Sequence, residues 1–560
     1  MWQASRDVMK IFFNSEVDAY GIQDLLRLFF GTCTRLVEPT NNVLLGFAVD
    51  LADNLAEGSA KEFAEDLTWA ILAEDDDCRI FELSGMHGWT SDCLNTTDAC
   101  LNLNLAENRA AVLASARLLA CRDDSLNLLI QIGLIGKLTE FCRPKRDNKR
   151  LLYFALCKLT GKTFPWGSLT GIRPTLIAAE AMKITPNHAA AENLLVRYYG
   201  VSLFKAQLAL TTAREEQHIL RQLPPDTCGV YIAIPFCPTR CLYCSFSTNE
   251  GIDPPNDLIN RYIDALSEEI ELTFAQLPFK ISTLYVGGGT PGILTAEQIA
   301  RLGQIIHRNM EFIPGAELTF EAGRPDRVDQ PALSAVYEAG FQKICLNPQT
   351  FHDRTLALVN RQHTVEQLIS TYEMARRMPF TNINMDLILG LPGETEADMR
   401  YTLKKLESLS PDSFTLHSLA IKRASNLKLQ AEDWLDVGAV HRRNKVLESL
   451  QEEGRALANR LGLVPYYMYR QKDGVGGLEN LGYARPGCGN RYNLAMMGDG
   501  LSILSFGAGA MSKAVSGDKV ERSPNVRSIQ AYIERHREMS ERKIIMLRQM
   551  NDNVIKSVHF

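Results

Sequence analysis

The segment YIAIPFCPTRCLYCSF, residues 231–246, carries the densest chemical signal in this 560-residue sequence. It starts as a short β-rich run and continues into a loop in which Cys237, Cys241 and Cys244 are separated by three and then two residues. Thiolates bind soft metals, and three of them on one loop can hold three irons of a [4Fe-4S] cluster. The spacing therefore predicts a cluster whose fourth iron is open to a chelating cofactor.

A structural zinc site and a redox-active cysteine pair are the alternatives for this loop. Zinc takes four protein ligands, and the loop contains no fourth Cys or His, so zinc is disfavoured. Cys228 lies before the strand and Cys345 lies within an apolar run, where a free cysteine usually packs as a small hydrophobic residue. Neither cysteine is assigned to the cluster.

Composition and charge narrow the class of protein. The net charge of −6 argues against a general electrostatic grip on nucleic acid or on an anionic membrane, so neither is expected as a partner. The start of the chain has no signal-peptide pattern, and no run of about 18 apolar residues occurs. Thirteen cysteines are too sparse for a disulfide scaffold, and these features together predict a cytoplasmic protein.

The length predicts two or three domains, and the pattern of apolar and polar residues changes after Pro225. Before that point the pattern is mainly helical, for example over Arg109–Ala120 and Asn148–Leu159. The Gly/Pro-rich stretch Gly161–Thr175 (GKTFPWGSLTGIRPT) interrupts any helix, and its simplest interpretation is an ordered connector. We therefore expect an N-terminal domain of unassigned role over residues 1–145 and a helical connecting region with the TGIRPT loop over 146–225.

After Pro225, short β-rich runs alternate with longer helical patterns, which is typical of βα units that form a parallel sheet or partial barrel. Catalytic residues in such folds gather on the loops that follow the strands. We expect the barrel over residues 226–424 and a C-terminal domain over 425–560, with helices at Asp433–Leu461 and Ile529–Gln549. The six expected barrel strands are Val230–Ile234, Thr283–Val286, Glu317–Glu321, Lys343–Leu346, Ile383–Leu389 and Ser413–Leu416.

The CxxxCxxC motif in the form YIAIPFCPTRCLYCSF resembles the radical S-adenosylmethionine (SAM) superfamily and, within it, the oxygen-independent coproporphyrinogen III oxidase group. The resemblance implies an α/β fold, a partial (β/α)6 radical SAM barrel with a mainly helical N-terminal domain and a small C-terminal α+β cap. It implies two cofactors, a [4Fe-4S] cluster and SAM, with SAM chelating the open iron. Cleavage of SAM then yields a 5′-deoxyadenosyl radical.

The resemblance also implies positions for SAM. The Gly287-Gly288-Gly289-Thr290 run resembles the family segment that receives the SAM amino group, although a triple glycine alone is often only a turn. Tyr231 is assigned a catalytic place near the cofactor, although an aromatic residue on a half-buried strand is often only packing. The further SAM contacts implied are Glu321, Gln349, Arg361, Asp386, Ala420 and, at an adenine or second SAM site, Met511.

Three stretches resemble the subgroup called HemZ: TGKTFPWGSLTGIRPT, FEAGRPD and PYYMYRQKDGVGGLENLGYARPG. The implied reaction is oxidative decarboxylation of two propionates of coproporphyrinogen III in heme biosynthesis. Phe246 stands where the oxidases carry a further cysteine, as it does in related heme chaperones, although the HNxxYW segment of the chaperones is missing here. A heme-binding chaperone, a radical SAM methylase and another tetrapyrrole-modifying enzyme therefore stay as alternatives.

A substrate with four propionates needs cationic partners, and a planar guanidinium group suits a carboxylate well. Tyr466, Tyr467 and Tyr469 are candidates to flank a macrocycle, although three tyrosines at this spacing more often pack across a strand. An external reductant such as flavodoxin or ferredoxin is the expected protein partner. The candidate substrate-binding residues are Arg324, Lys422, Arg470 and Arg485.

Overall fold

The structure is a computed structural model of the 560-residue chain. It describes the seven N-terminal strands and Leu25, and then residues 149–244, 254–419, 437–470 and 478–557 with a few short gaps. The chain divides into two compact units, residues 1–210 with 435–440 and residues 211–434 with 441–560. Each unit is described by itself.

The first unit contains a seven-stranded sheet, so the helix expected over Arg109–Ala120 is wrong and strand β6 occupies most of that range. A short apolar run fits a helix or a strand equally well by periodicity alone, and pairing with β5 and β7 decides it. The strand order is β2-β3-β1-β7-β6-β5-β4. The strands are β1 (Val8–Phe13), β2 (Thr34–Leu36), β3 (Leu45–Asp50), β4 (Trp69–Asp75), β5 (Cys78–Leu83), β6 (Ala114–Arg122) and β7 (Leu126–Leu134).

Helices follow this sheet, as expected for residues 146–225. They are α5 (Pro174–Ile184), α6 (His188–Asn193), the π-helical turn η1 (Leu194–Tyr198) and α7 (Leu203–Leu220). The Gly161–Thr175 stretch is ordered around buried Trp166, and the backbone N–H and the hydroxyl of Ser168 both donate to the carbonyl oxygen of Tyr199. These contacts fit the connector interpretation.

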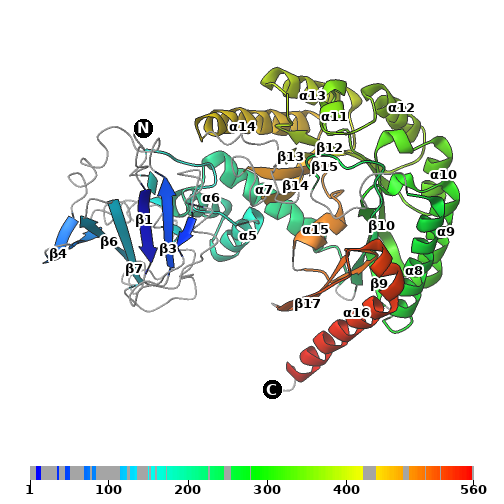
Figure 1. Cartoon of the computed structure of the whole chain (residues 1–560), viewed down its shortest axis with the longest axis horizontal. Coiled ribbons are helices and arrows are strands. Elements are labelled where there is room, and N and C mark those ends of the chain that lie inside the picture. Colours follow the sequence, from blue (N-terminus) through cyan, green and yellow to red (C-terminus); the bar gives the residue numbers. More distant parts are fainter. Residues whose placement is uncertain are drawn as a thin grey trace, which may run out of the picture. The chain divides into compact units, whose positions relative to one another are not determined.

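The second unit is built on an 11-stranded sheet whose centre is the barrel sheet β8 to β13, with all six strands parallel (Figure 1). All six expected strands are present, and the one over Lys343–Leu346 has the predicted bounds. The strands are β8 (Thr227–Ile234), β9 (Lys280–Gly288), β10 (Glu311–Gly323), β11 (Lys343–Leu346), β12 (Asn382–Leu389) and β13 (Ser413–Ser418).

Crossover helices cover the outer face of this sheet (Figure 1). Three of them begin at capping boxes, at Thr295, Thr364 and Thr395, which satisfy the free backbone N–H groups of the first turn. The helices are α8 (Asn256–Phe274), α9 (Ala296–Asn309), α10 (Gln330–Glu338), α11 (Asp353–Leu358), α12 (Val365–Arg376) and α13 (Glu396–Leu409), with 3-10 turns η2 (Pro291–Ile293) and η3 (Pro325–Arg327).

The C-terminal elements extend the barrel sheet at both edges. Strands β14 (Val464–Arg470) and β15 (Glu479–Ala484) join beyond β13, and β16 (Ile503–Phe506), β17 (Met511–Ser516) and β18 (Lys519–Pro524) join beyond β8. The long helices are α14 (Val437–Arg460) and α16 (Ile529–Ser557), and the short α15 (Arg491–Met497) lies on the inner face of the sheet, opposite the crossover helices (Figure 1).

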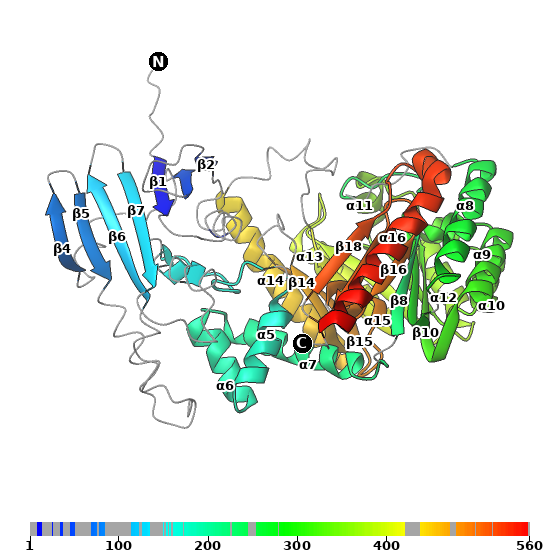
Figure 2. The ribbon, with the colours of Figure 1, turned by 90° about the horizontal axis from the view of Figure 1, so that it is seen from below.

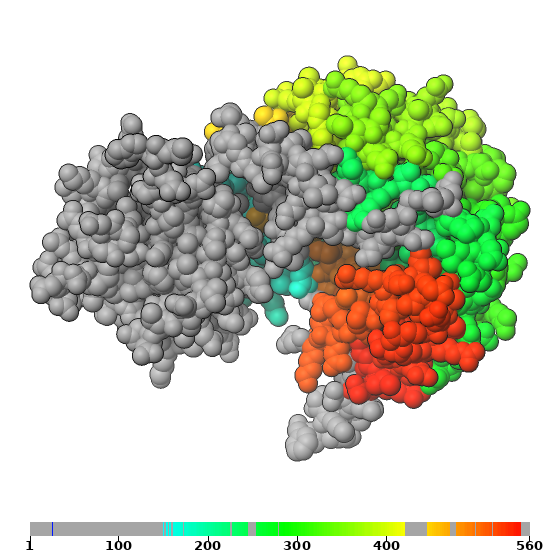
Figure 3. Space-filling view, viewed as in Figure 1, coloured from blue at the N-terminus to red at the C-terminus, as the bar shows by residue number. Residues whose placement is uncertain are grey.

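Helix α16 packs beside α8 (Figure 2), and a buried ion pair between Glu269 of α8 and Lys543 of α16 anchors this last helix. Glu269 also accepts the backbone N–H of Gly507 at 2.9 Å, and Lys543 donates to the carbonyl of Ser505 at 2.9 Å. The C-terminal strands and α16 form one continuous surface beside the barrel residues (Figure 3). This network fixes the turn after β16 next to the end of β8.

No helix among the described residues is long and apolar enough to cross a membrane.

Candidate functional site

The predicted cysteine motif lies in the loop that follows β8, at the carboxyl end of the parallel strands. We call residues 235–244 the cysteine loop. The loop after β9 holds its first part, because Gly289 N–H donates to the Ile234 carbonyl at 2.8 Å and Thr290 N–H donates to the Phe236 carbonyl at 2.7 Å. The sulfur of Cys237 lies 3.4 Å from the Thr290 hydroxyl. The glycine run and the first cysteine are therefore direct neighbours.

Two glycines permit this close approach. Gly288 has a φ of +119°, which disfavours any residue with a side chain. A Cβ atom added at Gly289 would lie 2.4 Å from the Phe236 carbonyl oxygen and 3.0 Å from the Cys237 sulfur. The glycine run and the start of the cysteine loop are thus packed too closely to admit a side chain at residue 289.

The second half of the cysteine loop is tied to residues 359–361. Leu242 N–H donates to the Val359 carbonyl at 3.1 Å, and the Thr239 hydroxyl donates to the Asn360 carbonyl at 3.1 Å. Burial raises the pKa of the Cys237 thiol to about 11, with smaller contributions from Cys244 and Cys241, although the Thr290 hydroxyl acts to lower it. Binding to iron removes such a proton, because the thiolate is the metal ligand.

Among the described residues, no three His, Cys, Asp or Glu side chains converge as ligands of a single ion. A [4Fe-4S] cluster binds each cysteine to a separate iron, so its thiolates do not need to share one ion. The three sulfurs on one loop, with a glycine run packed beside the first, fit such a cluster.

Two buried arginines support the cysteine loop. Arg324 donates to the Thr239 hydroxyl at 2.6 Å and forms a bidentate pair with Asp326, with both N–O distances 3.1 Å. Arg361 donates to the Tyr243 hydroxyl at 3.0 Å and to the Asn347 carbonyl at 2.7 Å. Arg324 is 3% exposed and these contacts occupy its guanidinium group, so a propionate would have to displace them.

Behind the cysteine loop, polar side chains line the inner face of the sheet. The Tyr285 hydroxyl lies 3.5 Å from a carboxylate oxygen of Glu321 and 3.8 Å from the sulfur of Cys345. Asn384 donates to Asp386 at 2.8 Å. These residues come from four consecutive strands, β9 to β12, and each lies at an inner-face position of its strand.

A stack of three tyrosines also lies on this face. The ring of Tyr492, from α15, lies 5.4 Å from the ring of Tyr231 and 4.7 Å from that of Tyr285. Tyr231 therefore has packing partners, and it also lies near Glu321, whose charge contributes to a raised tyrosine pKa after the larger effect of burial. Both the structural and the catalytic interpretation of Tyr231 agree with this position.

The two carboxyl groups of the inner face differ in ionisation. Burial, followed by the charge of Asp386, raises the pKa of Glu321 to about 8. Burial also acts to raise the pKa of Asp386, but interactions with His417, Asn384 and Thr415 outweigh it and lower the pKa. Near neutral pH, Glu321 therefore holds a proton more readily than Asp386, so a cationic group arriving beside Glu321 would favour its ionisation.

Several buried polar atoms at this end have no hydrogen-bond partner among the described residues: Asn347 Oδ1, Gln349 Oε1, Arg361 Nε and both ring nitrogens of His363. Gln349 also has a φ of +67°, and its backbone N–H and C=O pair with β12, at Asp386 and Ile388. Unpaired buried polar atoms are costly, and they mark a place where a polar ligand is expected.

The remaining predicted residues are spread more widely. Arg470 is buried and pairs in register with Glu479 near the carboxyl end of β13. Arg485 lies at the other end of β13, where it pairs with Asp412 at 2.7 Å. Met511 is 41% exposed at the start of β17. Ala420, Lys422 and Phe246 lie outside the described residues.

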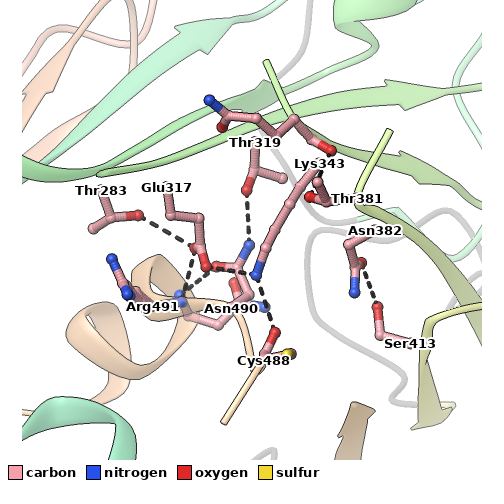
Figure 4. Close-up of polar contacts among 12 residues, drawn as sticks. Thr283, Glu317, Thr319, Lys343, Thr381, Asn382, Ser413, Cys488, Asn490 and Arg491 are labelled. Atoms are coloured by element: carbon pink, nitrogen blue, oxygen red, sulfur yellow. Dashed lines mark hydrogen bonds and ion pairs between the residues drawn. The ribbon is translucent and has the colours of Figure 1, made fainter. Parts of the chain in front are cut away.

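The amino end of the barrel carries a different polar network (Figure 4). Glu317 of β10 accepts the ammonium group of Lys343 at 2.7 Å, the backbone N–H of Arg491 at 2.8 Å and the Thr283 hydroxyl at 3.4 Å. Asn490 donates to the Thr319 hydroxyl at 3.0 Å. This network seats α15 and closes that end of the barrel.

A parallel barrel sheet with three cysteines after its first strand, a glycine run packed beside them and a pair of half-buried carboxyl groups defines an iron–sulfur barrel protein. Residues 231–406 match the family model described as the radical SAM superfamily. The chain is 34% identical over 405 residues to the oxygen-independent coproporphyrinogen-III oxidase-like protein HemZ of Bacillus subtilis, an alignment that covers 71% of this chain and 80% of that protein.

The heme chaperone HemW of Mycobacterium tuberculosis is 30% identical over 297 residues, which cover 52% of this chain and 70% of that protein. A solved structure of coproporphyrinogen III oxidase (HemN) from Escherichia coli aligns with a TM-score of 0.46 at 24% identity, over 59% of this chain and 73% of that chain. The chain belongs to the radical SAM superfamily, within its group of HemZ-like proteins. The cofactors of this superfamily are a [4Fe-4S] cluster and SAM, which confirms the cofactors expected from the sequence.

Sequence reasoning missed several residues of this end of the barrel: Tyr243, Tyr285, Asn347, Asn384, His417 and Tyr492. Asn384 and His417 carried a usable signal, because each interrupts an apolar strand at a position in phase with a known inner-face residue. Tyr492 carried no such signal, because it lies on α15, a helix far along the chain that packs against the barrel only in the folded protein.

Proposed function

We propose that the chain is an oxygen-independent coproporphyrinogen III dehydrogenase, which converts two propionates to vinyl groups by oxidative decarboxylation. The observation that supports this most is the inner-face pair of Glu321 and Asp386 behind the cysteine loop, in a chain similar over most of its length to an oxidase-like relative. SAM and the cluster together would supply a carbon-centred radical that removes a hydrogen atom from each propionate; carbon dioxide would then leave, and an external electron acceptor would take the remaining electron.

The chain's own residues would hold and shield these groups. Cys237, Cys241 and Cys244 would bind the cluster, and the glycine run packed beside Cys237 would offer its backbone polar groups to SAM. Glu321, once ionised, would pair with the SAM ammonium group. Asn347 and Gln349 would offer their unpaired amide oxygens to further polar groups of the cofactor.

For the substrate, Arg470 of β14 is the described arginine candidate that lies nearest the carboxyl end of β13. Tyr467 and Tyr469 of β14 alternate with it and face the other side of the sheet, where Tyr469 lies near His417. Arg485 lies at the opposite end of β13, so we rank it below Arg470 as a propionate partner. An external reductant such as flavodoxin or ferredoxin would reduce the cluster.

A heme-binding chaperone is the second candidate, because a relative named HemW covers 70% of its own length in alignment with this chain. Anaerobic incubation of the reconstituted protein with SAM, a reductant and coproporphyrinogen III separates the two. The dehydrogenase should form decarboxylated vinyl product together with 5′-deoxyadenosine. Deoxyadenosine without decarboxylated product would contradict the proposal, and stable heme binding without substrate-dependent SAM cleavage would favour the chaperone.

A further inference from the structure

His417 of β13 is a polar residue of the inner face that the proposed reaction does not use. Its side chain is 25% exposed, and its ring Nε2 lies 3.9 Å from Oδ2 of Asp386 on the neighbouring strand. The other ring nitrogen, Nδ1, lies 3.3 Å from Oδ1 of Asn480 on β15. The imidazole therefore bridges the carboxylate to a buried amide.

The orientation of Asn480 fixes the role of this imidazole. Asn480 is fully buried, and its Oδ1 accepts the backbone N–H of Ser418 at 3.0 Å, while its Nδ2 donates to the Tyr469 carbonyl at 3.4 Å. An amide oxygen that already accepts a backbone N–H can only accept from the ring as well. Nδ1 of His417 must therefore carry a hydrogen.

This hydrogen on Nδ1 has a consequence at the other ring nitrogen. A neutral imidazole with its hydrogen on Nδ1 would turn the lone pair of Nε2 toward the Asp386 carboxylate, which is repulsive. An imidazolium group instead presents an N–H there, and a charge-assisted contact results. Only the imidazolium form makes this charge-assisted contact to Asp386.

Asp386 is held on its other side as well. Its Oδ1 accepts from Asn384 at 2.8 Å, and the Ser413 hydroxyl lies 3.1 Å from the Asn384 amide oxygen, which orients that amide. Glu321, the second carboxyl group of this face, accepts from Tyr285 at 3.5 Å and from Asn347 at 3.4 Å, and neither of these side chains is cationic. The cationic contact thus distinguishes the two carboxyl groups.

We propose that His417 is a positioning residue that holds the Asp386 carboxylate in place for SAM, with Asn480 fixing the orientation of the imidazole. This inference rests on the proposed position of SAM at Asp386. It is independent of the tetrapyrrole substrate, so a failed decarboxylation assay leaves it standing.

The test is a double-mutant cycle on SAM affinity, measured by anaerobic equilibrium dialysis of the reconstituted, unreduced holoprotein. His417→Gln should weaken SAM binding about tenfold, because one charge-assisted contact to Asp386 is lost. Asp386→Asn should weaken it at least as much. The double variant should be no weaker than Asp386→Asn alone, because the histidine acts through the carboxylate.

Two further variants control for charge and for folding. His352, whose Nε2 lies 3.8 Å from Asp398 outside the inner face, is a matched histidine–aspartate pair, and His352→Gln should leave SAM affinity within about twofold of the parent. His417→Lys keeps a cationic donor and should bind SAM better than His417→Gln. Steady-state assays of His417→Gln should show a raised KM for SAM with kcat for SAM cleavage largely retained and an unchanged Tm.

Three results would overturn the proposal: parent-like SAM affinity in His417→Gln, fully additive effects in the double variant, or His417→Lys as weak as His417→Gln. An unchanged affinity in Asp386→Asn would overturn both this inference and the position of SAM at Asp386. A weakened Asp386→Asn beside an unaffected His417→Gln would overturn the role of His417 alone.

Discussion

Strand β10 carries a glutamate at each end of the barrel, and the two glutamates have opposite surroundings. Glu317, at the amino end, has an ammonium group, a backbone N–H and a hydroxyl as partners (Figure 4). Glu321, at the carboxyl end, has Tyr285 and Asn347 at 3.5 and 3.4 Å, and its pKa is raised to about 8. At the amino end, the protein itself satisfies the glutamate. At the carboxyl end, the glutamate has only weak partners, and a cationic ligand could pair with it.

The same contrast holds for the surrounding residues. At the amino end, the side chains of Lys343, Asn490 and Arg491 each donate a hydrogen bond within the protein. At the carboxyl end, Asn347 and Gln349 have amide oxygens without a partner among the described residues. The folded protein alone satisfies these polar groups at the amino end. At the carboxyl end, unpaired amide oxygens cost stability, and the binding of a polar ligand is the physical reason for this cost.

The largest expected effect comes from cysteines at the two ends. Cys241→Ala should lose the brown chromophore and all SAM cleavage, because two thiolates should not hold the cluster. The exposed Cys488 at the amino end is the control, and Cys488→Ala should keep both. Iron and sulfide content per chain and 5′-deoxyadenosine formation measure the outcome. Full iron content and activity in Cys241→Ala would refute the ligand assignment.

The glutamate pair gives the next largest effect. Glu321→Gln should weaken SAM binding by about tenfold to a hundredfold, because the ammonium group would lose an ionic partner. Glu317→Gln should keep SAM affinity but lower the free energy of unfolding by about 3 kcal/mol, since Lys343 would lose its carboxylate. Equilibrium dialysis measures SAM affinity, and urea denaturation measures stability. Weakened SAM binding in Glu317→Gln with unchanged binding in Glu321→Gln would contradict the assignment of the ligand site to the carboxyl end.

A smaller effect should follow from adding a side chain to the glycine run. Gly289→Ala brings a methyl group against the Phe236 carbonyl and the Cys237 sulfur, and it should lower stability by about 1–3 kcal/mol and reduce cluster content. Gly500→Ala is the control, because the nearest atom to its added Cβ lies 4.0 Å away. Equal cluster content and stability in both variants would show that the close approach at Gly289 has no consequence.

The smallest effect is a pH dependence of the cofactor-free protein. The folded-state pKa of Glu321, about 8, is above its ordinary value of 4.5, so its stabilising contribution is complete below about pH 4.5 and is lost as the pH rises to 8. Glu321→Gln lacks this loss and should gain about 1–3 kcal/mol over the parent between pH 5 and pH 8. Urea denaturation at several pH values measures it, and a constant difference would contradict the raised pKa.

The sequence predicted the barrel strands well, because each buried parallel strand is a local apolar run between helical segments. Strand β11 has the predicted bounds at Lys343–Leu346. Strand β6 was mistaken for a helix, because only its pairing with neighbouring strands settles an apolar run of that length. The expected third unit supplies five strands to the barrel sheet, a result of long-range pairing that no local pattern encodes.

The candidate site was predictable where a motif carries the chemistry. The neighbouring positions of Cys237 and Thr290 followed from two loops at the carboxyl ends of adjacent strands. The contacts of Tyr492 and of His417 did not follow, because each depends on an element brought in from elsewhere in the chain. Arg324, a candidate for substrate binding, has its guanidinium group paired with Asp326 and Thr239, since a guanidinium group fits a nearby carboxylate as well as a propionate.

The most direct test of the account is the electron paramagnetic resonance spectrum of the reduced, reconstituted protein during titration with SAM. If the cluster at Cys237, Cys241 and Cys244 keeps one iron open for the cofactor, SAM should shift the g values of the reduced cluster in the parent and in Glu317→Gln. The shift in Glu321→Gln should require a higher SAM concentration. A spectrum that SAM leaves unchanged in the parent would contradict the central claim that the carboxyl end of the barrel binds SAM at the cluster.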